Sequence, residues 1–177
     1  PFSQAFDHPV EYSGKERSVK INEVREQMRK YNADFHLLTS NDDIMWLLNI
    51  RGSDLKYSPL LLSFALIGTE QIILFIDEAK IPAKLASAFD KLGIVILPYD
   101  EISGILSTVS EGHSVLFSPQ VTSVELFNSI AKNSKHIEDI SIPVRLKSIK
   151  NKTEIMNISN VMIRDGVALT KSFNWFE

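Results

Sequence analysis

Between residues 41 and 59 (NDDIMWLLNIRGSDLKYSP), the chain combines an apolar anchor with polar groups able to bind a ligand. The polar candidates are an amide, a guanidinium, a glycine and a carboxylate: Asn49, Arg51, Gly52 and Asp54. A polar loop held by a rigid apolar scaffold is where proteins often place binding groups. Arg51 and Asp54, three residues apart, can instead pair across a tight turn and only hold the loop. The sequence leaves both interpretations open.

Other residues offer weaker chemistry. The four histidines do not stand three or four residues apart, so the helical zinc-binding pattern is absent: His8, His36, His113 and His136. Asp42 and Asp43 can act as a general acid and base. Because they follow Ser40, they are more typical of the first turn of a helix, whose dipole favours negative charge. No G-x-S-x-G or glycine-rich phosphate loop is present. The sequence therefore indicates no catalytic residue and no metal ligand.

Composition excludes several classes of partner. The 177 residues carry 19 Lys and Arg against 22 Asp and Glu, a net charge of −3, with 44% apolar residues. This balance predicts a globular core and argues against nucleic acid or anionic membrane as a partner. No apolar run approaches the roughly 18 residues of a membrane span. The absence of cysteine excludes disulfides and fits a reducing compartment, so we expect a cytoplasmic protein.

The elements that would position these residues alternate along the chain. A capping-box pattern at Ser13 and Glu16 predicts the start of a helix whose apolar stripe comes three, four and three residues apart. That stripe is Ile21, Val24, Met28 and Tyr31. A strand at 35–39, a short helix ending at Leu48 and a polar loop at 51–59 follow.

Two strand-like runs, 60–68 and 71–77, are separated by two residues and predict an antiparallel hairpin. Short strands at 94–97, 114–117 and 136–140 then alternate with helices, which predicts parallel crossovers. The expected fold class is α/β: a mixed, largely parallel sheet with an antiparallel hairpin and helices on both faces.

The chain divides into four predicted parts. Residues 1–12 read as the end of a linker, residues 13–140 as the α/β domain, and residues 141–151 as an extended basic connector. Residues 152–177 form a helical stripe with no stop signal before the last residue. We therefore expect the chain to be a piece of a longer protein, with the core of this last helix beyond residue 177.

Two motif clusters resemble the Xaa-Pro aminopeptidase family (aminopeptidase P) of the three-domain type. Residues 43–54 resemble its D-x-x-W-L-x-N-x-R-G-x-D signature, and the hairpin at 65–77 is similar to the strand pair that follows. Residues 150–154, 164–169 and 173–177 resemble its K-N-x-x-E, R/K-D-x-V-A-L and F-x-W-L-E segments, with Phe176 in place of leucine.

The resemblance implies the middle of the three domains, a creatinase/prolidase N-terminal-like domain, followed by the first helix of a pita-bread catalytic domain. Family members remove the residue before an N-terminal proline using two divalent metal ions, usually manganese, and a homodimer is expected of the parent. Their metal ligands lie in the catalytic domain, so this chain alone should be inactive, with no catalytic residue and no cofactor. Its expected role is to cover the active-site cleft and help position the peptide, with Asn49, Arg51, Gly52 and Asp54 nearest the substrate.

Two other functions remain open on the sequence. The large subunit of the FACT histone chaperone carries an aminopeptidase-like domain without metal chemistry, so a pseudo-enzyme or binding module is the alternative. A complete, stand-alone α/β binding domain fits less well, because the last helix would expose its apolar stripe.

Overall fold

The core of the molecule is a six-stranded mixed sheet. The computed structural model describes residues 3–176, and the strand order is β6-β5-β4-β2-β7-β8. The strands are β2 (Phe35–Leu38), β4 (Phe64–Gly68), β5 (Ile72–Phe75), β6 (Ile94–Leu97), β7 (Ser114–Phe117) and β8 (Lys135–Glu138). Five strands run in one direction and β4 runs against them, pairing antiparallel with both β2 and β5. The predicted fold class, including the hairpin, is confirmed.

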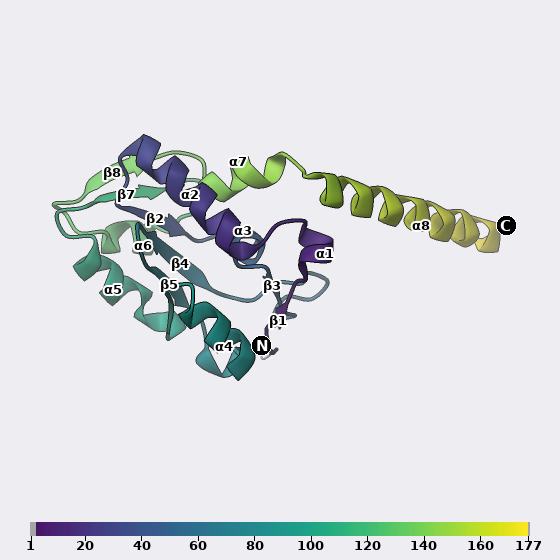
Figure 1. Cartoon of the computed structure of the whole chain (residues 1–177), viewed down its shortest axis with the longest axis horizontal. Coiled ribbons are helices and arrows are strands. Elements are labelled where there is room, and N and C mark those ends of the chain that lie inside the picture. The colour runs from purple at the N-terminus through teal and green to yellow at the C-terminus, as the bar shows by residue number, and fades with distance from the viewer. Residues whose placement is uncertain (1–2, 177) are drawn as a thin grey trace.

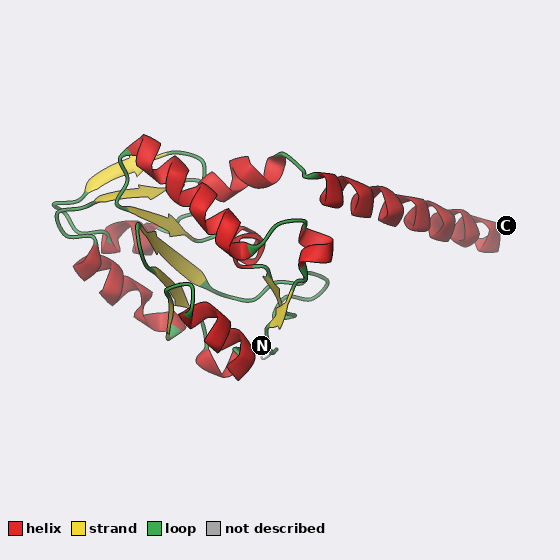
Figure 2. Cartoon of the chain, viewed as in Figure 1, coloured by secondary structure: helices red, strands yellow, loops and turns green. Residues whose placement is uncertain are grey.

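Helices cover both faces of this sheet (Figures 1 and 2). They are α1 (Val10–Ser13), α2 (Arg17–Tyr31), α3 (Asn41–Leu48), α4 (Ala83–Asp90), α5 (Ile102–Val109), α6 (Val124–Ser129), α7 (Ile142–Ser148) and α8 (Lys152–Phe176), with 3₁₀ turns η1 (Glu78–Lys80) and η2 (Tyr99–Glu101). Neighbouring strand residues point to opposite faces, so Leu38 joins the core under α2, α3 and α7 and Leu37 joins the core under α5 and α6.

The local sequence signals explain most of these elements. Ile21, Val24 and Met28 of α2 are buried against the sheet, as their spacing predicts. Helix α2 ends where Asn32 adopts a left-handed conformation with φ of 51°, which asparagine tolerates better than most residues. Asp42 and Asp43 occupy the first turn of α3, as predicted.

Two local predictions for the N-terminal part of the chain are wrong. Glu16 rather than Ser13 precedes α2, because the chain turns at Gly14 and Ser13 ends the short helix α1. Residues 3–12 are not a free linker end: β1 (Phe6–Asp7) pairs with β3 (Ile50–Arg51), and Ala5 is buried. Residues 1–2 and 177 lie outside the described part of the chain.

The segment 141–151 is not extended. Helix α7 occupies most of it, and Ile142 and Pro143 at its start are buried in the core. One of its basic residues, Lys147, holds the helix to α3, because its ammonium pairs with both Asp42 and Asp43. The role of this segment as a connector between domains stays a prediction.

His36 explains why α7 packs against the sheet. The imidazole is completely buried in β2; its Nδ1 lies 3.0 Å from the carbonyl oxygen of Leu116, and its Nε2 accepts the Ile142 N–H at 3.2 Å. Accepting that bond requires an unprotonated Nε2, and burial lowers the pKa of His36 to about 4. His36 is therefore a structural histidine that joins two strands to the start of α7.

Helix α8 projects away from the sheet domain (Figure 1). Among its described residues none is buried, and its apolar side chains are exposed along its whole length. Its first turns are held by α1: Asn151 Nδ2 donates to the Ser13 carbonyl at 2.9 Å, and Asn157 Nδ2 contacts the carbonyls of Glu11 and Tyr12. The helix is thus fixed to the domain only at its N-terminal end.

Candidate functional site

The segment that carries the candidate residues leaves α3 through a sharp reversal. Asn49 follows the last residue of α3 and has φ of 50°, a left-handed conformation. The chain then runs as β3 antiparallel to β1, which fixes Ile50 and Arg51 opposite Asp7 and Phe6. This pairing, which the sequence did not reveal, holds the start of the segment against residues 6–7.

Asn49 serves a buried lysine. The Lys20 side chain from α2 is 1% exposed, and its Nζ donates to Asn49 Oδ1 at 2.7 Å and to the Trp46 carbonyl at 2.9 Å. The same ammonium lies 4.4 Å from the centre of the Trp46 ring, a cation–π contact. Burial lowers the pKa of Lys20 to about 8, although the nearby Glu154 carboxylate acts in the opposite direction. Asn49 and Trp46 therefore compensate a charge taken from water.

Arg51 is half-buried and turns back on the end of α3. Its Nη1 donates to the carbonyl oxygens of Met45 and Ile50, at 2.9 and 2.8 Å. Burial lowers the pKa of the Arg51 guanidinium, which nevertheless stays charged. Arg51 and Asp54 do not pair with each other, so this structural alternative is wrong.

A pocket of about 200 Å³ opens beside Arg51 and is called the Arg51 pocket below. It lies between α1, the end of α3 and the first turns of α8. Its lining residues are His8, Tyr12, Ser13, Lys20, Trp46, Arg51, Lys150, Glu154, Asn157 and Ile158. The pocket therefore brings together two residues of the signature region, Trp46 and Arg51, with residues from both ends of the chain.

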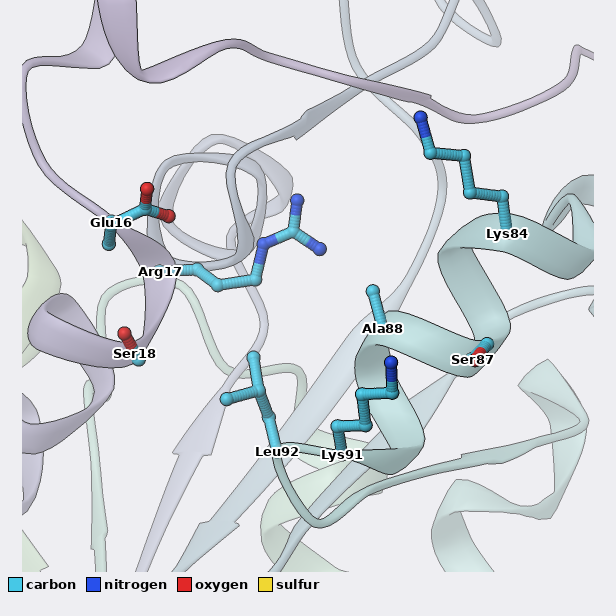
Figure 3. Close-up of a pocket in the computed structure, with 8 residues that line it drawn as sticks. All are labelled: Glu16, Arg17, Ser18, Lys84, Ser87, Ala88, Lys91 and Leu92. Carbon is cyan, nitrogen blue, oxygen red and sulfur yellow. The ribbon is translucent and has the colours of Figure 1, made fainter.

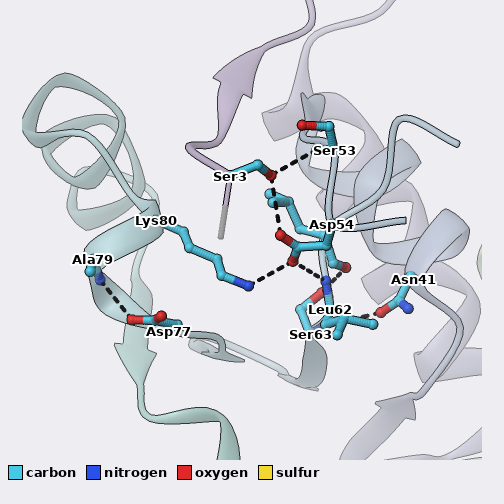
Figure 4. A network of polar contacts seen from close by, with 10 residues as sticks. Ser3, Asn41, Ser53, Asp54, Leu62, Ser63, Asp77, Ala79 and Lys80 are labelled. Atoms are coloured by element: carbon cyan, nitrogen blue, oxygen red, sulfur yellow. Dashed lines mark hydrogen bonds and ion pairs between the residues drawn. The ribbon is translucent and has the colours of Figure 1, made fainter. Parts of the chain in front are cut away.

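Asp54 points the other way, into a buried network (Figure 4). Its Oδ2 accepts from Lys80 Nζ at 2.7 Å and from the Leu62 N–H at 2.9 Å, and Ser3 Oγ donates to Oδ1 at 3.1 Å. Burial alone would raise the pKa of Asp54, but these hydrogen bonds and the Lys80 charge hold it below its ordinary value. Asp54 thus ties the loop to η1 and faces no open cavity.

Gly52 is required by close packing. A Cβ at this position would lie 2.1 Å from Leu61 Cδ2, and Leu61 is completely buried. The polar loop predicted at 51–59 is therefore only partly exposed at its start: Gly52 and Asp54 are buried, while Ser53 is exposed. Of the four candidate residues, only Arg51 lines the pocket, and Asn49 acts on it through Lys20.

Sequence reasoning missed Lys20, His8 and Tyr12. One signal was available for Lys20: it stands four residues before Val24, on the apolar stripe of α2, where a lysine needs internal partners. His8 and Tyr12 stack with ring centres 5.9 Å apart across the turn into α1. Their place at the pocket depends on the pairing of β1 with β3, and strands of two residues leave no recognisable pattern in the sequence.

A larger, open groove of about 560 Å³ lies between the start of α2 and α4 (Figure 3). Ala88 and Leu92 line its apolar part, while Arg17, Lys84 and Lys91 reach toward it from both sides. Arg17 already pairs with Asp7 and lies over the Phe89 ring. Lys84 and Lys91 are exposed and give the groove a cationic rim, while Arg17 Nη1 is buried without a hydrogen-bond partner among the described residues.

The residues present do not form a two-metal centre. Within residues 3–176, no group of three or more His, Cys, Asp or Glu side chains is arranged to hold a metal ion. A metal site needs several such ligands converging on one point. In the same range, no helix has the length and apolarity needed to cross a membrane.

The mixed sheet and the 43–54 segment define a creatinase/prolidase N-terminal domain, and the chain belongs to that family, whose profile matches residues 1–154. Two curated relatives are Xaa-Pro aminopeptidase 1 of Dictyostelium discoideum, 37% identical over 100% of this chain, and Xaa-Pro aminopeptidase ApepP of Drosophila melanogaster, 34% identical over 95%. The chain spans 28% of the length of each relative.

A solved structure extends the likeness to three dimensions. The X-prolyl aminopeptidase of Caenorhabditis elegans, described as a cytosolic enzyme with a di-nuclear active site, superposes with a TM-score of 0.91. It is 30% identical and aligns with 99% of this chain, which covers 30% of that protein. The prolidase of Pyrococcus horikoshii shares the fold, with a TM-score of 0.54 at 18% identity.

Proposed function

We propose that this chain is the N-terminal-domain portion of an Xaa-Pro aminopeptidase, a two-metal enzyme that removes the residue before an N-terminal proline. The observation that carries the proposal is the match to the Caenorhabditis elegans enzyme over 99% of the chain, α8 included. The related enzyme's di-nuclear site supports two metal ions in the parent protein, and manganese is the metal proposed. The proposed location is the cytoplasm, as described for that enzyme.

Within that enzyme, the chain would have no catalytic residue of its own. Residues 152–176 would form the first helix of the catalytic domain, and the exposed apolar side chains of α8 support this, because they need a covering core. The sheet domain would then cover one side of the active-site cleft, with peptides bearing proline in second position as substrates. A homodimer is the proposed assembly.

Arg51 is the residue proposed to lie nearest that cleft. Its pocket opens at the junction between the sheet domain and α8, where a following domain would attach. Asn49 would act indirectly by holding Lys20, and Gly52 and Asp54 would act only through the conformation of the loop. These three are positioning residues.

The test is hydrolysis of an Xaa-Pro peptide with Mn²⁺, comparing this chain with the full-length product of its gene. Activity is expected only in the full-length protein. Arg51→Ala there should raise KM or lower kcat, while Arg29→Ala, an exposed arginine of α2, should change neither. No activity in the full-length protein would favour a pseudo-enzyme, and activity of this chain alone would mean that the catalytic site is misplaced.

A further inference from the structure

We propose that the Arg51 pocket is a binding site for a single carboxylate group. The pocket brings hydrogen-bond donors and three positively charged side chains together, with one carboxylate in its lining. The inference extends the role proposed for Arg51. Only the source of the carboxylate in the cell depends on the proposed function. Binding itself can be measured in this chain without any catalysis.

Two donors at the pocket have unused capacity within the described residues. The Trp46 Nε1–H is buried and has no hydrogen-bond partner. The hydrogen bonds of Arg51 use only Nη1, which leaves the other guanidinium N–H groups to face a ligand. A buried donor left without an acceptor is costly, and a carboxylate accepts from a guanidinium and an indole at once.

The charges around the pocket also favour an anion. Lys20, Arg51 and Lys150 supply three positive charges, and Glu154 is the one carboxylate among the lining residues. Glu154 Oε2 accepts the Asn151 N–H at 2.9 Å at the start of α8, and its negative charge offsets part of the positive charge, as its effect on the pKa of Lys20 indicates. Burial lowers the pKa of His8, and the charges of Arg51 and Lys20 lower it further, so His8 presents a neutral imidazole at pH 7 and adds no positive charge.

The size of the pocket limits the ligand. A volume of about 200 Å³ corresponds to roughly six or seven waters at about 30 Å³ each. It accommodates a carboxylate on a short aliphatic stem beside the Trp46 and Tyr12 rings and is too small for a nucleotide or a folded peptide. Two sources have this chemistry: the C-terminal carboxylate of a peptide, and an acidic side chain of a polypeptide that covers the pocket.

The test uses the tryptophan of the pocket as its reporter. The chain has two tryptophans, so Trp175→Phe in the exposed end of α8 leaves Trp46 as the one indole. N-acetylglutamine and the α-amide of N-acetylglutamate are isomers that carry one carboxylate each. The carboxylate is on the backbone in the first and on the side chain in the second. N-acetylglutamine amide is the uncharged control. Each is titrated against the chain while Trp46 fluorescence is followed.

We expect saturable binding of at least one isomer in about the millimolar range and none of the neutral amide. Preference for N-acetylglutamine would identify a peptide terminus, and preference for the side-chain isomer would identify an acidic residue. Arg51→Gln should weaken binding about tenfold or more, because it removes a charge-assisted hydrogen bond. Arg29→Gln, which removes an exposed arginine of α2, should leave binding unchanged.

The absence of saturable binding of both isomers would overturn the proposal, as would equal binding of the neutral amide. Unchanged affinity in a folded Arg51→Gln variant would also overturn it. The comparison of charged and neutral ligands on the Trp175→Phe chain needs no change in the pocket, so the proposal stays testable even if the Arg51 variant fails to fold. Failure here would leave the peptidase assignment untouched, because that assignment is judged by hydrolysis in the full-length protein.

Discussion

Lys20 and Lys80 are both buried, yet their charges are compensated in different ways. Lys80 Nζ lies 2.7 Å from the Asp54 carboxylate, so the two form an ion pair. Substituting either partner would leave the other as an unpaired buried charge. Lys20 has only carbonyl and amide oxygens and an aromatic face, so its positive charge remains available to the Arg51 pocket. The first arrangement holds a loop, and the second creates the electrostatic character of a site.

His36 makes stability depend on pH in a defined window. Its pKa is lowered from the ordinary 6.5 to about 4 in the folded chain, so the unfolded chain binds more protons between these values. The contribution of His36 to the free energy of unfolding should be fully present above pH 6.5 and should be lost as the pH falls toward 4. Between pH 7 and 4.5 the free energy of unfolding should decrease by about 2 kcal/mol from this group. Urea unfolding at the two pH values measures the decrease.

A His36→Gln variant separates this effect from that of the carboxylates. Glutamine does not titrate, so the decrease between pH 7 and 4.5 should shrink by about 2 kcal/mol. His8, whose pKa is also lowered, contributes to the part that remains. The carboxylates with a lowered pKa, such as Asp34 and Asp139, have ordinary values of 3.8 and lose their contribution mainly below that pH. An undiminished pH dependence in the variant would show that another group is responsible.

At this scale the sequence was a partial guide. It marked Arg51 as a candidate, but it could not show that Asp54 has Lys80 as its partner, because the two are 26 residues apart and meet only through the fold. The pairing of β1 with β3 likewise joins residues more than 40 positions apart by two-residue strands. Such contacts carry no local periodicity.

The turn between α1 and α2 determines how α8 begins. Gly14 has φ of 67°, and a Cβ there would lie 2.3 Å from Asn151 Oδ1 and 2.8 Å from Thr153. Asn151 both caps α8, by accepting the Glu154 N–H at 2.9 Å, and donates to Ser13. One glycine therefore permits the close approach of two segments that are 137 residues apart.

Gly14→Ala should displace Asn151 and destabilise the chain beyond the cost of the backbone alone. We expect a loss of about 2 kcal/mol or more in the free energy of unfolding, with faster amide exchange in the first turns of α8. Gly112→Ala is the matched control, because Gly112 has φ of 73° but no atom within 4 Å of its Cβ position. Equal losses in both variants, measured by urea unfolding, would contradict the steric role of Gly14.

Element types were predictable where one periodicity dominated. The α2 stripe and the hairpin of β4 and β5 follow from spacing and from a two-residue gap. The 141–151 segment was misread because Pro143 and its basic residues are typical of connectors, whereas proline is equally tolerated in the first turn of a helix. The tertiary contacts of this helix, among them the burial of Ile142 and the bond between its N–H and His36, have no counterpart in the local sequence.

For the molecule as a whole, only the first turns of α8 are expected to contribute to the free energy of unfolding of the sheet domain. Residues beyond 158 on this helix bury nothing among the described residues, and a helix without packing is marginal in water. Removing residues 159–177 should change the free energy of unfolding of the sheet domain by less than about 0.5 kcal/mol. Urea unfolding of both chains checks this, and amide exchange should be fast beyond residue 158 in the intact chain.

A large loss of stability on truncation would mean that the far part of α8 packs on the sheet domain or on a second copy. Sedimentation of the intact and shortened chains distinguishes these two cases, since only self-association changes with concentration. Truncation after 158 keeps Asn151, Glu154 and Asn157, so the contacts with α1 are the same in both chains.

The order of strands in the sheet also constrains how the chain can assemble. β2 lies between β4 and β7, and its Phe35 is opposite Val115, 80 residues later. β4, β5 and β6 are close in sequence, as are β7 and β8, so each group can form locally while β2 must join them. During synthesis β2 is made before any of these partners, and one of its edges stays unpaired until β7 emerges. Early docking of α2 and α3 on this strand would protect that edge from pairing with another nascent chain.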